Sequence, residues 1–165
     1  MANVNTDLVT NFVAVPQVLN SASQLHGVKR VATGTIALAA GDLSATDTVM
    51  LAPIPSNASI TSIKLFNDDL DSGTTNTADV GLYNTDLSVV DADAYASAIT
   101  DLRGAVTVGT EVAFEARDIN KMGQKVWQDA GLTSDPALTY FVGIGFPAAG
   151  DQAGDLSFVI EYVVS

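Results

Sequence analysis

The C-terminal residues 155–165 alternate between apolar and more polar side chains with a period of two. One side of this segment is entirely apolar and consists of Leu156, Phe158, Ile160, Tyr162 and Val164. A period of two is typical of a β-strand that buries one face. A strand this regular would invite aggregation if its edges were open. We therefore expect it to be paired inside a sheet and covered by a second layer.

Six more segments show strand-like patterns between clusters of Gly, Pro, Asn and Asp. In the third of them, Thr61, Ile63 and Leu65 are predicted to share one face. Pro53 and Pro55 are expected to mark the exit of the second. The segments are 28–38, 47–52, 59–66, 78–83, 105–115 and 140–146.

Two segments favour short helices instead. Residues 91–100 are rich in Ala, and Asp91 or Asp93 could cap a helix there. Residues 119–128 follow Asp118 and place their apolar side chains near one stripe, with Gly131 as the stop. That stripe contains Ile119, Met122, Val126, Trp127 and Ala130.

Residues 1–27 differ from the rest because isolated apolar residues are scattered among Asn, Thr and Ser. Pro16 interrupts the most apolar stretch, which is typical of an edge strand or an extended arm. We therefore expect an N-terminal arm over residues 1–27 and one β-sandwich domain over residues 28–165. The fold class predicted is all-β: a two-sheet antiparallel sandwich, of jelly-roll type, with one or two short helices and an extended arm.

Charge and composition narrow the function. The chain of 165 residues has a formal net charge of −12, and sixteen of its 19 acidic residues are Asp, a residue that favours turns. Such a surface repels phosphate, so nucleic-acid binding is not expected. The chain has no cysteine, no secretory signal pattern and no apolar run of ~18 residues, so we expect assembly in a cytoplasm without disulfides or a membrane span.

Candidate catalytic groups are scarce. His26 is the only histidine and lies in the predicted arm, so no nucleophile–base relay can be argued. Glu111 and Glu115 lie four residues apart in an extended segment, too far for a paired-carboxylate mechanism, and Glu115 is expected to form a surface pair with Arg117. We predict no enzymatic activity and no cofactor.

The loop 67–79 gathers acidic residues, which calcium favours as ligands. Its spacing does not match the twelve-residue calcium loop, so a solvated turn is the preferred interpretation, and calcium binding stays open. The acidic and amide residues concerned are Asn67, Asp68, Asp69, Asp71 and Asp79.

Several strings occur in an order that resembles small accessory proteins of tailed-bacteriophage heads, the cement or decoration proteins of podovirus-type capsids. They are Met1-Ala-Asn-Val-Asn-Thr-Asp-Leu-Val-Thr10, Ile63-Lys-Leu-Phe-Asn-Asp68, Asp79-Val-Gly-Leu-Tyr83, Val89-Val-Asp-Ala-Asp93, Phe114-Glu-Ala-Arg-Asp-Ile-Asn-Lys-Met-Gly-Gln-Lys-Val-Trp127 and Gly131-Leu-Thr-Ser-Asp-Pro136. The resemblance implies a jelly roll on the outer surface of an icosahedral head. It also implies a dimer or trimer that binds the major capsid protein across subunit seams. It supplies no ligand residues.

We expect the partner contacts in residues 2–20 and in the helix 119–129. Trp127 has two interpretations, a core anchor on the helical stripe, which is preferred, or the centre of a partner-binding spot. The candidate contact residues are Val4, Leu8, Phe12, Val15, Lys121, Lys125 and Trp127. The alternative function is a glycan-binding module of a fibre or spike, for which the candidate aromatic residues are Tyr83, Tyr95 and Tyr140.

Overall fold

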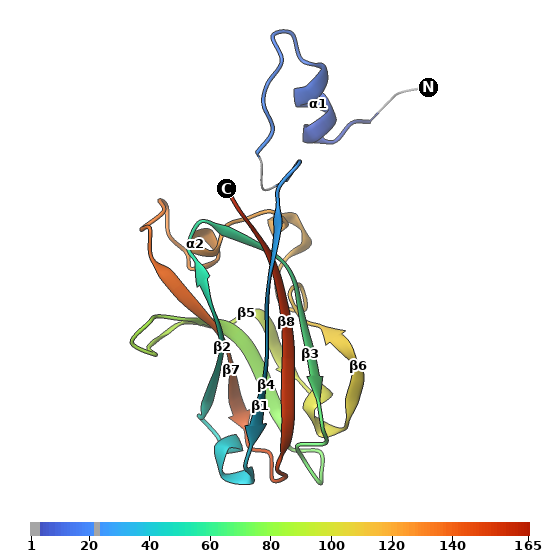
Figure 1. The fold of residues 1–165 in the computed structure, drawn as a ribbon, viewed down its shortest axis with the longest axis vertical. Coiled ribbons are helices and arrows are strands. Elements are labelled where there is room, and N and C mark those ends of the chain that lie inside the picture. Colours follow the sequence, from blue (N-terminus) through green and yellow to red (C-terminus); the bar gives the residue numbers. More distant parts are fainter. Residues whose placement is uncertain (1–3, 22–23) are drawn as a thin grey trace.

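The computed structural model describes residues 4–21 and 24–165, and eight strands form two antiparallel four-stranded sheets (Figure 1). The first sheet has the order β1-β8-β3-β6 and the second has the order β2-β7-β4-β5. The strands are β1 Lys29–Leu38, β2 Thr48–Pro55, β3 Ala58–Asn67, β4 Thr77–Tyr83, β5 Val89–Ile99, β6 Val106–Glu111, β7 Thr139–Ala148 and β8 Gly154–Val164. The prediction of a two-sheet all-β sandwich is confirmed.

The strand pairing follows a single rule. The first strand of the chain pairs with the last, and each following strand pairs with the one before the last in turn: β1 with β8, β2 with β7, β3 with β6 and β4 with β5. These nested pairs are distributed over the two sheets. This nested order defines a jelly roll. As predicted, the C-terminal strand β8 is an interior strand, because it lies between β1 and β3.

The inner faces of the two sheets form one apolar core. Strand β8 contributes Leu156, Phe158 and Ile160, while Tyr162 is only half-buried. Strand β7 contributes the four residues of its alternating pattern, Tyr140, Val142, Ile144 and Phe146. The predicted alternation therefore corresponds to burial in β7 and in β8 as far as Ile160. At the end of β8 it fails, because Val163 of the opposite face is buried while Tyr162 and Val164 are only half-buried.

The predictions for the inward face of β3 and for the end of β2 were wrong. A bulge between Ile60 and Ser62 changes the phase of β3, so Ile60 joins Ile63 and Leu65 in the core and Thr61 is exposed. Strand β2 continues through Pro53 and Pro55 instead of ending before them. Because β2 is an edge strand, the missing proline N–H groups cost no ladder bond with a second neighbour.

The Ala-rich segment 91–100 is not a helix but lies largely in strand β5. Tyr95 and Ala96 are buried there, and the strand pairs with β4 through three irregularities of register. Gly81 on β4 makes this approach possible, because a Cβ at that position would collide with the backbone carbonyls of Asp91 and Ala92. Tertiary packing thus overrides the helical preference of alanine.

The predicted helix 119–128 is broken into two short pieces. They are the 3-10 turn η3 Ile119–Lys121 and the helix α2 Val126–Asp129, with Gly123 between them at a φ of +84°. Ile119 and Met122 are exposed, and Val126 is the member of this segment that enters the core. Trp127 is half-buried and is not part of the core, so its preferred interpretation as a core anchor was wrong.

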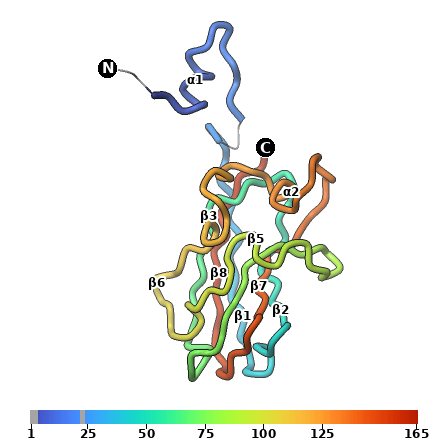
Figure 2. The backbone as a smooth tube through the Cα atoms, turned by 180° about the vertical axis from the view of Figure 1, so that it is seen from behind, coloured from blue at the N-terminus to red at the C-terminus, as the bar shows by residue number. Residues whose placement is uncertain are grey.

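The N-terminal region is not extended throughout, since it contains the helix α1 Asp7–Val13. The remaining elements are the 3-10 turns η1 Ala40–Leu43 and η2 Asp101–Arg103. In Figures 1 and 2, α1 lies beyond the end of the sandwich that carries α2 and the C-terminus, while η1 lies at the opposite end. No helix in the described part of the chain is long and apolar enough to cross a membrane.

The close β4–β5 approach gives a test of the fold. Gly81→Ala should lower the free energy of unfolding by about 3 kcal/mol, because the methyl group must displace β5 backbone rather than a mobile side chain. Gly104→Ala is the control, since Gly104 has an extended backbone with no atom near its Cβ position, and its effect should stay below about 1 kcal/mol. Equal effects in urea unfolding would refute this account of β5.

Candidate interaction surface

The structure brings together, at one end of the sandwich, the two regions that we predicted to contact a partner. We call this end the arm end; it comprises α1 and the residues around it, residues 118–129 and the C-terminus (Figures 1 and 2). The opposite, distal end is formed by the turns 39–47, 68–76 and 149–153.

The arm organises itself through local polar contacts. The Asn11 Nδ2 donates to the Asn20 Oδ1 over 2.8 Å, and the Asn20 Nδ2 donates to the Leu8 carbonyl over 3.0 Å. These bonds fold residues 17–20 back along α1. The apolar side chains of the arm nevertheless remain largely in solvent: Val4 is 95%, Phe12 65% and Val15 98% exposed. Of the predicted contact residues in the arm, only Leu8 is half-buried.

The arm meets the sandwich at a groove of about 340 Å³ that is lined by Leu8, Gln24, Thr61, Met122 and Gly123. The Gln24 side chain packs over Gly123, where a Cβ would lie only 3.2 Å from it. Met122, 66% exposed, and Ile119, 79% exposed, extend the apolar surface of the arm onto the sandwich. The two predicted regions therefore meet at this groove, through Leu8 of the arm and Met122 of the sandwich.

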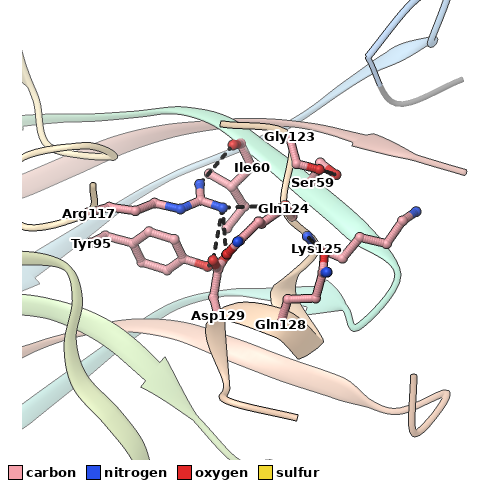
Figure 3. A network of polar contacts seen from close by, with 9 residues as sticks. All are labelled: Ser59, Ile60, Tyr95, Arg117, Gly123, Gln124, Lys125, Gln128 and Asp129. Atoms are coloured by element: carbon pink, nitrogen blue, oxygen red, sulfur yellow. Dashed lines mark hydrogen bonds and ion pairs between the residues drawn. The ribbon is translucent and has the colours of Figure 1, made fainter. Parts of the chain in front are cut away.

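A buried ion pair holds the sandwich side of this surface in place (Figure 3). The Arg117 Nη2 donates to both Asp129 carboxylate oxygens, at 2.9 and 3.0 Å, and both side chains are almost fully buried. Arg117 also donates to the carbonyls of Ile60, at 3.4 Å, and Gln124, at 3.3 Å. One guanidinium thereby connects β3 to the middle and to the last residue of the segment 118–129.

Aromatic rings complete the environment of the guanidinium. Its central carbon lies 5.7 Å from the ring centre of Tyr95 and 5.2 Å from that of Phe114, which are cation–π distances. The Tyr95 hydroxyl donates to Asp129 over 3.3 Å. Burial raises the pKa of the Asp129 carboxyl, an effect that Arg117 and the Tyr95 hydroxyl oppose, and burial likewise raises the pKa of Tyr95 well above its ordinary value.

Sequence reasoning missed this network. Arg117 was predicted to form a surface pair with Glu115, but Arg117 is 4% exposed and Glu115 instead accepts a hydrogen bond from the Ser97 backbone N–H at 2.7 Å. The network also explains the broken helix, because the Gln124 carbonyl that would accept a helical bond accepts from Arg117 instead. The sequence places Arg117 three residues after Phe114, but nothing in it identifies Asp129 as the partner.

The basic and aromatic candidates have different environments. The Lys125 Nζ donates to the Asn57 carbonyl at 3.0 Å and to the Ser165 carbonyl at 3.2 Å, and it also contacts the Ser165 hydroxyl. It therefore fastens the C-terminus to the β2–β3 turn. The Trp127 backbone N–H donates to the Ser56 carbonyl at 3.0 Å, and the residue is half-buried. Lys121 is exposed.

The acidic loop is built around a buried carboxylate rather than being a solvated turn. Asp71 is 3% exposed and accepts hydrogen bonds from the backbone N–H groups of Thr75 and Asn76, at 2.9 and 2.8 Å. Asp68 and Asp79 similarly accept from backbone N–H groups of other segments, Asp155 and Ala98. Within residues 4–21 and 24–165, no three His, Cys, Asp or Glu side chains are grouped so as to hold a metal ion.

The remaining candidate groups have structural environments. Glu111 accepts from the Ser62 hydroxyl and from the backbone N–H groups of Ile63 and Ala113. His26 is exposed in the arm at a φ of 65°. Tyr83, Tyr95 and Tyr140 are at most 4% exposed, so none of the three can stack on a sugar ring.

Comparisons with solved structures give likenesses of the fold. One chain in the capsid of Ralstonia phage GP4 is similar with a TM-score of 0.61, and one in the capsid asymmetric unit of cyanophage Pam1 with a TM-score of 0.53. Each is 20% identical and covers 84% of this chain and 86% of the matched chain. No protein-family profile and no curated protein matches the sequence.

The ion pair yields a direct stability test. Asp129→Ala leaves Arg117 buried without its carboxylate and should lower the free energy of unfolding by about 3–5 kcal/mol. Glu161→Ala is the matched control, because it breaks the exposed pair of Lys29 and Glu161 and should cost at most about 1 kcal/mol. The double variant Arg117→Met/Asp129→Leu should recover much of the loss, since it leaves no charge buried. Similar losses in the two single-residue variants would contradict the assigned role.

Proposed function

We propose that this protein is a structural component of a bacteriophage virion that binds the outer surface of the capsid and stabilises contacts between major capsid protein subunits. It is not an enzyme, and it acts by adhesion. The observation that carries the proposal is the arm end: a sandwich with a complete core that leaves a row of apolar side chains in solvent at one end. The likeness of the fold to chains in two phage capsids supports this setting.

Exposed apolar side chains at this density favour a protein partner. In the arm, Phe12, Val13, Val15 and Leu19 are all at least 60% exposed, which is costly in water unless a partner covers them. Contiguous apolar patches of this kind mark interaction sites on soluble proteins. A formal net charge of −12 favours a protein partner over nucleic acid, so the packaged genome is not the target.

The roles of the candidate contact residues follow from their environments. Val4, Phe12 and Val15 are free to enter pockets of a capsid subunit, and Leu8 positions α1 against the sandwich. Lys121 and Trp127 extend the contact onto the sandwich. Lys125 acts mainly by holding the C-terminus, so its removal should affect stability as well as binding.

The burial of Tyr83, Tyr95 and Tyr140 argues against the alternative function, a glycan-binding module. A sugar site of the usual kind needs exposed aromatic rings, and all three tyrosines considered for it lie in the interior.

Binding to empty capsid shells of the phage that encodes this chain tests the proposal. Phe12→Asp/Val15→Asp/Leu19→Asp should weaken co-sedimentation with the shells at least about tenfold, because buried apolar anchors carry most of the affinity of an interface. Deletion of residues 2–20 should have at least the same effect, while the sandwich keeps its melting temperature.

The matched control adds the same charge at the distal end. Ala45→Asp/Ala149→Asp/Ala153→Asp changes three exposed positions there and should leave shell occupancy unchanged. Full occupancy by the arm variants, or equal loss in both triple variants, would refute the proposed binding surface.

A further inference from the structure

The four sheet edges of the sandwich are not equally protected. Strand β2 contains Pro53 and Pro55 and a bulge, and β5 pairs with three irregularities of register. Strand β6 has six residues, a register shift, and Gly109 at a φ of +78°. Bulges, prolines and short length are the devices by which proteins prevent an edge strand from pairing with another chain.

Strand β1 has no bulge, no proline and no short length, and its only charged side chains, Lys29 and Arg30, lie at its first two positions. It spans ten residues without proline, and its ten pairs with β8 run in continuous register from Lys29–Val163 to Leu38–Gly154. No other described strand pairs with its free side. Nine of its ten residues are not buried, and Val31 and Ile36 are 54% and 39% exposed. Along this ten-residue edge, every second residue therefore presents its backbone N–H and C=O groups to a further strand.

The charges near β1 allow a second copy of this chain to approach this edge. The chain carries a net charge of −12, yet residues 28–38 contain Lys29 and Arg30 and no acidic residue. Repulsion between two copies is therefore weakest where their β1 strands meet.

The sequence of β1 is compatible with itself in an antiparallel pair. A two-fold axis perpendicular to the sheet at Thr33 or at Gly34 keeps outward-facing residues opposite outward-facing ones. In both registers Lys29 and Arg30 lie opposite uncharged residues within 36–39 of the second copy, so like charges do not meet. Thr33 and Thr35, both exposed, lie at the centre.

We propose that two copies of this protein associate through antiparallel β1–β1 pairing, which joins their first sheets into one continuous eight-stranded sheet. Because the arm immediately precedes β1, the two arms leave this dimer in opposite directions. If the proposed capsid binding holds, one dimer reaches two separate sites on the shell. The pairing itself does not depend on that binding.

Sedimentation velocity of the purified full-length protein tests the pairing without any capsid. The wild-type protein should sediment with about twice its chain mass of 17.0 kDa. Thr33→Lys/Thr35→Lys places lysines opposite one another in either register and should sediment as a monomer, with an unchanged circular dichroism spectrum.

Ala105→Lys/Thr107→Lys is the matched control, because it adds the same charge at exposed positions on or beside the β6 edge and should remain dimeric. A monomeric wild-type protein would overturn the proposal. So would a dimer that the β1 lysines leave intact, or one that both double variants dissociate alike. Since no shell is present, these results are independent of the shell-binding experiment.

Discussion

The buried ion pair of Arg117 and Asp129 is the interaction on which the arm end depends. An unpaired guanidinium in this environment would be prohibitively costly, so Arg117 must keep its carboxylate and its two carbonyl partners together. Those partners lie on β3, in the middle of the segment 118–129 and at its last residue. The result is a short, irregular segment with a fixed shape, whose apolar residues Ile119 and Met122 remain outside because no regular helix can turn them inward.

The sequence predicts the fold well wherever a strand buries one face only. β7 and, as far as Ile160, β8 follow their period of two, and the sandwich class follows from them. The errors arise where one contact outweighs local preference. A bulge changes the phase of β3, Gly81 lets an Ala-rich segment pair as β5, and Arg117 captures a carbonyl that a helix would use. Such contacts do not follow the period of a strand or of a helix, so the local pattern of apolar and polar residues gives no signal for them.

The same distinction applies to the candidate surface. Scattered apolar residues around Pro16 indicate an arm, and the structure leaves those side chains in solvent. The sequence cannot show that the arm and residues 119–127 share one end of the molecule, because this depends on the rolled topology. It also hides that Lys125 is engaged with Ser165 and that Asp71 is buried. The acidic surface and the exposed arm are the features on which the proposal of a protein that acts by adhesion rests.

Hydrogen–deuterium exchange of the full-length protein, free and bound to empty capsid shells, tests the central claim most directly. Shell binding through the arm end should slow exchange in residues 4–21 and in residues 118–127. Exchange in the distal turns 39–47, 68–76 and 149–153 should be the same in both states. Protection confined to the distal turns, or no protection of the arm at full occupancy, would contradict the account.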